Sequence, residues 1–505
     1  MRYATNTTTI VCRALALAII LAGCGIETAP SDHSSGLGHV SFANSGHPDA
    51  QGAFIRGLSL LHSFEYEDAA VAFQEAQAID STFAMAYWGE ALTYNHPLWA
   101  QQDLARAQSV LLKLGASAQE RVESAPTARE KDYLATLEAL YFGEGTKHER
   151  DDAYAAAMAT LAESYPDDDD AVSMYALALL GTSHEGRDTR IYMRAAAQAE
   201  RVYDRNAAHP GAVHYLIHAY DDPDHAPLGL SAAHTYARIA PQANHALHMP
   251  SHIFLALGQW ENVIASNTDA WQAAVARAER LGKPIEERAP GYHALYWRGY
   301  AYLASGDAEG AGADVDTMAA DIDRLPSRSV RSHYLRTRAA FVVDQVDPLA
   351  GISSERATAM LAKIVASDDL GWSTPAVNDF AYAWAAIAAG DLVAARSRAR
   401  EIEATVIAQF DRASDHLVVP LDVMHHQLLG LISYKQGYPN QAEFHLKMAA
   451  QLEQSLPFDF GPPHPVKPAN ELTGEFLMMI GKTEEAETFL RLARDRNPGR
   501  LPAST

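Results

Sequence analysis

Apolar residues recur at helical spacing along most of the chain, and few segments alternate in the manner of a β-strand. Alanine-rich amphipathic runs are separated by short turns that contain glycine, aspartate or proline. Apolar side chains spaced three and four residues apart share one face of a helix, whereas a half-buried strand needs a period of two. The pattern predicts an all-α protein made of many amphipathic helices.

The helices recur in pairs, with small residues at fixed positions. The last pair carries Gly474, Gly481, Ala486 and Pro498, and the pair before it carries Gly430, Gly437 and Ala442. Small residues let two helices approach closely, glycine closes the turn between them, and proline ends the second helix. One pair cannot bury its apolar face alone, so pairs must stack. We expect one α-solenoid of stacked antiparallel helix pairs over residues 50–500, followed by a short tail at 501–505.

This spacing resembles the tetratricopeptide-repeat family over nearly all of residues 50–500. The segments AYWGEALTYNHPLW, HYLIHAYDDPDHAPLG, HMPSHIFLALGQW and GPPHPVKPANELTGE are similar to those of a histidine-rich group of bacterial tetratricopeptide proteins. The resemblance implies a superhelix whose concave groove binds a peptide or a protein, and we keep a small-molecule ligand as a further candidate occupant of this groove. It also implies that positions 2, 5 and 9 of the first helix in each pair point into that groove.

Histidines are concentrated in one segment of the chain. Eight of the 22 lie between His209 and His252. In the repeat register, His245, His248 and His252 take positions 2, 5 and 9 of one first helix, which places all three in the groove. His248 and His252 are four residues apart, the spacing at which two imidazoles on a helix reach one ion.

The neighbouring first helices carry related side chains. The preceding unit has His214 and His218, also four residues apart, and then Asp221 and Asp222. Either aspartate suits a metal ligand or a partner that fixes a histidine tautomer. The following unit places three side chains at positions 2, 5 and 9, namely His293, Tyr296 and Tyr300. Three successive first helices would thus present histidine, tyrosine and aspartate to one wall.

We expect a divalent metal, zinc or copper, in this groove, because neutral imidazoles with or without a carboxylate suit both ions. The expected ligands are His214, His218, His248, His252 and Asp222. The residues expected to line the groove around them are His245, His293, Tyr296, Tyr300, Glu90, Glu471 and Glu475. The alternative is that these imidazoles only cap helices and bond to backbone carbonyls.

The sequence leaves the choice between binding and catalysis open, and it assigns no catalytic residue. The paired histidines lack the glutamate of the HExxH metalloprotease motif, and no GxSxG elbow, phosphate loop or dinucleotide fingerprint is present. One hypothesis is a protein that holds a ligand in the groove together with a metal. The other is a metal-dependent enzyme, such as a hydrolase, that uses the same groove.

The N-terminus carries a targeting signal. An apolar run over residues 14–21, too short to span a bilayer, ends in Leu21-Ala22-Gly23-Cys24. This ending resembles the bacterial lipoprotein signal, which implies removal of residues 1–23 and lipidation of Cys24. The absence of aspartate after Cys24 favours the outer membrane over the inner, on the periplasmic face. The alternative is a plain secretory signal. Residues 24–49, rich in glycine, serine, proline and histidine, predict a flexible tether.

Charge and cysteine content exclude some classes of function. The formal net charge of -23 argues against nucleic acid as a partner, because a polyanion repels an acidic surface. The two cysteines, Cys12 and Cys24, both fall in or next to the signal segment. The body of the protein therefore has no thiol for a disulfide, a cysteine nucleophile or thiolate ligation, so a metal site must use other side chains.

Overall fold

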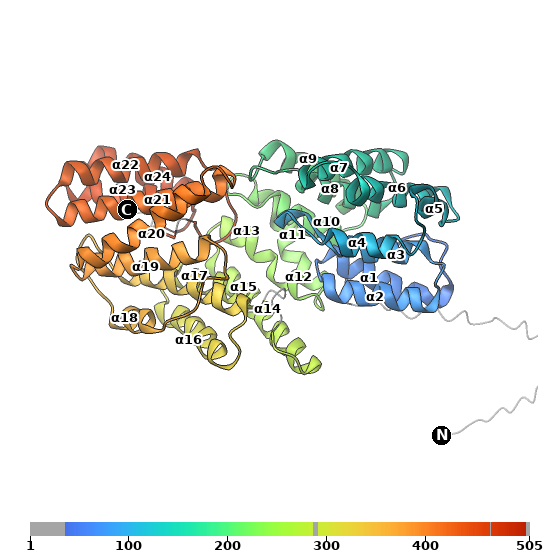
Figure 1. The fold of residues 1–505 in the computed structure, drawn as a ribbon, viewed down its shortest axis with the longest axis horizontal. Helices are drawn as coiled ribbons and strands as arrows, with labels where there is room; N and C mark the ends of the chain where they lie inside the picture. The colour runs from blue at the N-terminus through green and yellow to red at the C-terminus, as the bar shows by residue number, and fades with distance from the viewer. Residues whose placement is uncertain (1–35, 286–290, 465, 501–505) are drawn as a thin grey trace, which may run out of the picture. The chain divides into compact units, whose positions relative to one another are not determined.

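Helices account for nearly all regular structure in the chain (Figure 1). The structure, a computed structural model, describes residues 36–285, 291–464 and 466–500. Residues 33–505 form one compact unit. The expected signal segment at 1–23, the expected lipidation site Cys24 and the tail at 501–505 lie outside the described residues. None of the described helices is both long enough and apolar enough to cross a membrane.

The first part of the solenoid runs from residue 48 to residue 239. Its helices are α1 (Gln51–His62), α2 (Tyr66–Ile79), α3 (Ala84–Leu92), α4 (Leu104–Leu111), α5 (Ala118–Glu123), α6 (Ala128–Phe142), α7 (Lys147–Ser164), α8 (Asp169–Leu180), α9 (Thr189–Tyr203), α10 (Pro210–Ala219) and α11 (Ala226–Ile239). Two short 3-10 helices, η1 (Pro48–Ala50) and η2 (Pro97–Trp99), accompany them. The strands β1 (Asn95–His96) and β2 (Gln101–Gln102) pair antiparallel around η2.

The second part continues to residue 496. Its helices are α12 (Asn244–His248), α13 (Pro250–Ala256), α14 (Trp260–Leu281), α15 (Gly291–Ala304), α16 (Ala308–Arg324), α17 (Arg328–Gln345), α18 (Glu355–Ala362), α19 (Ser373–Ala388), α20 (Leu392–Gln409), α21 (Asp415–Lys435), α22 (Pro439–Ser455), α23 (Ala469–Met479) and α24 (Thr483–Arg496). Consecutive helices such as α19 and α20, α21 and α22, and α23 and α24 pack against each other. The predicted all-α solenoid of antiparallel helix pairs is confirmed.

Glycines act as the repeat spacing predicts. A Cβ atom on Gly430 would lie 2.7 Å from the Leu446 side chain, and one on Gly474 would lie 2.6 Å from Leu490. These positions need glycine because the second helix of each pair packs directly on the first. Gly437 has φ +83° and makes the left-handed turn between paired helices, a conformation that costs other residues energy.

Part of the predicted tether is packed onto the body. Leu37, Val40 and Phe42 are buried, and the Phe42 ring meets the Phe54 ring at 5.3 Å. The backbone N–H of His39 donates to the carbonyl of Ala208 at 2.9 Å. The prediction of a flexible tether over 24–49 is therefore wrong for residues 36–49. These apolar side chains, sparse within a polar stretch, remove enough surface from water to hold the segment in place.

The hydrophobic core has two large parts that meet at α15. Trp297 and Tyr300 belong to the core of the first part, whereas Leu295 and Leu303 belong to the core of the second. One face of α15 thus packs into the core of the first part of the solenoid, and another face packs into the core of the second part. Its N-terminal turns, which carry His293, are held from both sides. This position fixes the backbone of one wall of the candidate site.

The close approach of α1, α2 and α3 yields a stability prediction. A Cβ on Gly89 would lie 2.3 Å from the ring of Phe73, which is fully buried and cannot retreat. We expect Gly89→Ala to lower the free energy of unfolding by about 1–3 kcal/mol, despite its better helix propensity. Urea unfolding followed by circular dichroism measures the change. Gly437→Asn is the control, because no atom crowds that glycine and asparagine tolerates its left-handed turn. An unchanged midpoint for Gly89→Ala would contradict the packing.

Candidate metal centre

Six histidines from three helical segments meet at one place in the solenoid. Helix α10 supplies His214 and His218, and α15 supplies His293. His245, His248 and His252 come from α12 and α13. The latter two helices are continuous in backbone direction through Met249 (φ −54°, ψ −36°), and only the missing N–H of Pro250 interrupts their hydrogen bonds. The spacing of four residues between His248 and His252 is therefore preserved.

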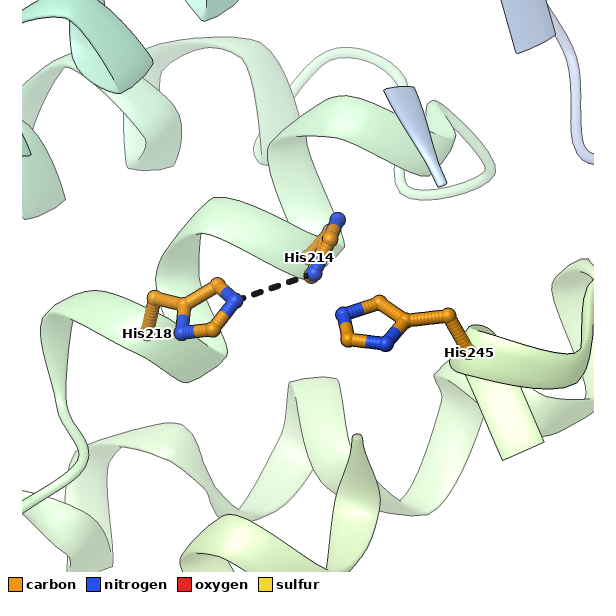
Figure 2. Close-up of side chains that lie close together, drawn as sticks. All are labelled: His214, His218 and His245. Carbon is orange, nitrogen blue, oxygen red and sulfur yellow. Dashed lines mark hydrogen bonds between the residues drawn. The ribbon is translucent and has the colours of Figure 1, made fainter. Parts of the chain in front are cut away.

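The first triad consists of His214, His218 and His245, whose side chains point toward one another from α10 and α12 (Figure 2). Their nearest ring nitrogens lie within 4.8 Å of one another. The two Nε2 atoms of His214 and His218 are 3.1 Å apart. Nδ1 of His214 donates to the backbone carbonyl of His62 at 2.7 Å, so its Nε2 carries a lone pair. Nε2 of His245 is buried and has no hydrogen-bond partner.

The second triad consists of His248, His252 and His293, with nitrogens again within 4.8 Å. Nδ1 of His248 lies 2.7 Å from Oδ1 of Asn267. That oxygen is the acceptor, because the amide nitrogen of Asn267 donates to the carbonyl of Val263 at 2.8 Å. Nδ1 of His252 lies 2.5 Å from Oδ2 of Asp221. Both Nδ1 atoms therefore carry hydrogen.

This tautomer assignment leaves two lone pairs facing each other. Nε2 of His248 and Nε2 of His252 are 3.1 Å apart, and when both rings are neutral with hydrogen on Nδ1, neither Nε2 has a hydrogen to give. Two nitrogens bound to one tetrahedral zinc ion at about 2.0–2.1 Å lie about 3.3 Å from each other. Metal-bound histidines also donate their second N–H to a carboxylate, carbonyl or amide oxygen, as these two do. The two Nε2 atoms are therefore spaced like two ligands of one metal ion, and the acceptors that orient their rings are in place.

Five of the six imidazoles are held in the neutral form that binds metals. Burial, followed by neighbouring imidazoles, lowers the pKa of His214, His218, His245 and His293 well below the usual value. Burial and then His252 lower the pKa of His248 to about 3. At neutral pH these imidazoles have no proton to lose before they coordinate an ion.

A cavity of about 450 Å³ borders both triads. His218 and His245 of the first triad line it, as do His252 and His293 of the second. The remaining walls are largely aromatic and acidic, and are formed by Phe64, Glu65, Tyr66, Glu67, Asp68, His96, Leu98, Trp99, Gln101, Arg277, His333 and Phe460. This volume falls in the range of small-molecule sites.

Phe64 forms the wall over the first triad. Its ring lies 4.3 Å from that of His214 and 5.5 Å from that of His245, between ring centres. The backbone at Phe64 has φ +57°, and Ala100, next to the cavity residue Trp99, has φ +50°. Non-glycine residues in this left-handed region store strain, and such strain is concentrated at functional sites. Among the described residues these are the only two of this kind, and both adjoin the cavity.

Burial of the histidines differs from the open groove that the repeat register predicts. His214 and His248 are fully buried rather than exposed on a concave surface. The cause is long-range packing: α1 contacts α10, and the loop after α1 lays Phe64 over the first triad. Phe460, from the loop that follows α22, lies 5.5 Å from His252 in the same way. Segments distant in sequence thus close the groove into a cavity.

Several residues expected at the site lie elsewhere. Asp222 forms an ion pair with Arg187 and accepts from His225, so it does not face the triads; its neighbour Asp221 contacts His252 instead. The two aspartates differ because consecutive residues after α10 point in different directions. Glu90 is buried against Gln74 and Gln77, at 2.7 Å each, and does not line the cavity.

The other expected groove residues do not line the larger cavity: two tyrosines line a second, smaller cavity, and two glutamates form ion pairs. Tyr296 and Tyr300 line a cavity of about 20 Å³, roomy enough for a water molecule, beside Arg500. Glu471 accepts from Lys467 at 2.5 Å and from Arg500 at 2.7 Å, and Glu475 accepts from Lys467 at 2.7 Å. These carboxylates are neutralised by the cations and do not line the larger cavity.

The sequence reasoning missed the supporting residues. Asn267 lies on α14, and the carbonyl of His62 lies at the end of α1, so no local spacing connects either with the triads. His333 on α17 also lines the cavity and follows the pattern of histidines on first helices, which is a usable signal. His62 itself bonds to Asp170 at 2.9 Å and to Tyr215 at 3.0 Å. These bonds fix the end of α1 against α8 and α10.

Comparison with known proteins identifies no relative. No protein-family model matches the chain, and no curated protein matches it. Among solved structures, a monomeric mutant of IFIT1 with Gppp-AAAA is 12% identical, with TM-score 0.39, covering 88% of this chain and 99% of that one. Yeast Tom70 is 11% identical, with TM-score 0.33, covering 89% and 85%. The Cut9 and Hcn1 assembly of the APC/C is 13% identical, with TM-score 0.30, covering 86% and 78%. At these scores the likeness says nothing of what this chain binds.

Because of the left-handed backbone at Phe64, we expect the usual order of stability of an alanine and a glycine variant to be reversed. Phe64→Ala removes the ring and should cost about 3–5 kcal/mol of unfolding free energy, as for a buried phenylalanine. Phe64→Gly removes the same ring but relieves the left-handed backbone, which costs other residues about 1–2 kcal/mol. We expect the glycine variant to be the more stable of the two in urea unfolding. Greater stability of the alanine variant, the order normal at ordinary backbone positions, would contradict the conformation at Phe64.

Proposed function

We propose that this protein binds a divalent metal, zinc or copper, in its histidine triads and presents the ion to a ligand in the adjoining cavity. The observation that carries the proposal is the pair of Nε2 lone pairs of His248 and His252, 3.1 Å apart, with both Nδ1 atoms committed to acceptors. With both rings neutral, the two lone pairs repel each other unless a cation lies between them. Zinc and copper both accept imidazole ligands readily, so the donor set does not choose between them.

The shape of the cavity supports a small-molecule or peptide ligand. Four imidazoles of the triads line it beside the rings of Phe64, Trp99 and Phe460. A ligand in the cavity would contact the ions and the aromatic wall together. An acidic chain with a net charge of -23 makes nucleic acid an unfavourable partner, and a protein or peptide segment remains compatible with the helical-repeat scaffold.

Catalysis is a second candidate function, and one observation favours it. Each triad offers three protein nitrogens, which leaves a tetrahedral ion one open position, as in catalytic zinc sites. A water there would be activated for hydrolysis of a substrate in the cavity. The test is turnover of chromogenic ester and phosphate substrates by the metal-loaded chain. Turnover lost in His252→Gln would support an enzyme, and no turnover with zinc, copper or nickel would favour a binding protein.

We also propose that the chain is lipid-anchored at Cys24 on the periplasmic face of the outer membrane. The motif Leu21-Ala22-Gly23-Cys24 supports this location. In a bacterial host, the native chain should fractionate with the outer membrane, and Cys24→Ser should be released from it, because the acylated thiol is absent. Membrane fractionation and labelling with a fatty-acid analogue measure this. Equal membrane association of Cys24→Ser would argue for a plain secretory signal.

Metal content tests the main proposal. The full chain, purified with a tag that contains no histidine, should retain zinc or copper after desalting. His248→Gln combined with His252→Gln should remove at least the metal of the second triad, because both lone pairs are lost. Elemental analysis by mass spectrometry measures the content, and circular dichroism checks that the helices persist. Retention of the full native metal content in the double variant would overturn the assignment.

Three further variants sharpen this test. His234→Gln changes an exposed histidine of the same segment and should leave the metal content unchanged. Asp221→Asn removes the carboxylate behind His252 and should weaken metal affinity about 10–100-fold, whereas Asp222→Asn should not, because Asp222 pairs with Arg187. Competition with a fluorescent chelator measures these affinities. Equal affinities for both aspartate variants would contradict the role of Asp221.

A further inference from the structure

The two triads are separate sites that share one wall. Their nitrogens form two distinct groups, and within each group all atoms lie within 4.8 Å. A single ion at about 2.0–2.1 Å from each nitrogen cannot reach all six. Yet His218 of the first triad and His252 of the second have ring centres only 5.5 Å apart, and His245 and His248 have ring centres 6.1 Å apart.

Each triad has its own supporting acceptors. The carbonyl of His62 fixes His214 in the first triad, and Asn267 and Asp221 fix His248 and His252 in the second. Each triad also contains one pair of histidines four residues apart with Nε2 atoms at 3.1 Å. The spacing and the distance between Nε2 atoms are the same on α10 and on α12 with α13, while acceptors hold both rings of the second pair and the His214 ring of the first. Consecutive units of the solenoid thus each carry a histidine pair, and each pair suits one ion.

The charge around such a pair of ions would be poorly compensated. All six ligands are imidazoles. Asp221 lies against His252, and three further carboxylates line the cavity, those of Glu65, Glu67 and Asp68, the last of which pairs with Arg277. These carboxylates compensate only part of the charge of two divalent ions held by neutral ligands. Such a site attracts an anionic oxygen ligand from the cavity.

We propose that the two triads hold two divalent ions side by side, and that the cavity admits a small oxyanion with an apolar body as their shared ligand. This inference rests on the proposed metal function. His218 and His252, one from each triad, both face the cavity, so a carboxylate or phosphate entering there meets both ions. The rings of Phe64, Trp99 and Phe460 then cover the apolar part of the ligand.

Zinc stoichiometry tests the number of ions. The full chain, stripped with chelator, reloaded with zinc and desalted, should hold two ions. The His214→Gln and His248→Gln variants should hold one ion each, and the variant that combines these two substitutions should hold none. His234→Gln is the matched control and should hold two. Circular dichroism of the apo-proteins checks folding, and His218→Gln replaces His214→Gln if that variant does not fold.

The outcomes separate this inference from the proposed function. One ion in the native chain, lost in either single variant, would overturn the two-metal centre while the metal function stands. No ion in the native chain would overturn both. Two ions in the native chain that both persist in His214→Gln and in His218→Gln would place the second ion outside the first triad, and the inference would fail.

Calorimetry with benzoate and acetate tests the ligand. Benzoate should bind the two-zinc protein at least tenfold more tightly than acetate does, because only benzoate reaches the aromatic wall. Affinity for benzoate should fall at least tenfold in the one-zinc His214→Gln variant and vanish in the apo-protein. Phenyl phosphate run in parallel distinguishes a phosphate from a carboxylate preference. Equal benzoate binding with and without zinc, or no binding of either aromatic oxyanion to the two-zinc protein, would overturn the ligand assignment.

Discussion

The candidate site depends on three buried hydrogen bonds, in each of which Nδ1 of a histidine donates to an acceptor. The carbonyl of His62, the amide oxygen of Asn267 and the carboxylate of Asp221 each take one N–H. Each bond fixes a ring orientation and turns the Nε2 lone pair inward. A buried imidazole pair that could choose its tautomer would simply form a hydrogen bond. Because the choice is removed for His248 and His252, their geometry in the neutral form favours a cation between them.

Burial distinguishes this site from an open repeat-protein groove. The stacked helices supply the histidines at regular intervals, but two loops from distant parts of the chain cover them, one with Phe64 and the other with Phe460. The left-handed backbone at Phe64 shows that the first loop is held in place at an energetic cost. The result is an aromatic cavity with imidazoles along one side. Such a cavity suits a small ligand better than an extended peptide.

The site lies where the two cores of the solenoid meet. Helix α15 contributes to both cores and carries His293, while α10 and α12 belong to the first. Well-packed helices hold side chains more precisely than loops do, which a metal site requires. The acceptors come from α1, from α14 and from the residues after α10, so the rings are oriented by elements outside the helices that carry them.

The sequence alone was enough to predict the all-α repeat architecture, because helical periodicity and the spacing of glycines such as Gly430 and Gly474 are local properties. It also placed His214, His218, His245, His248, His252 and His293 on first helices, since spacing on a helix fixes the face. Only the tertiary structure decided that Asp221 rather than Asp222 supports His252, that Asn267 and His62 complete the site, and that Glu90, Glu471 and Glu475 lie elsewhere. Those contacts join residues far apart in the chain, or depend on the direction of one side chain after a helix end, and neither is encoded in a local pattern.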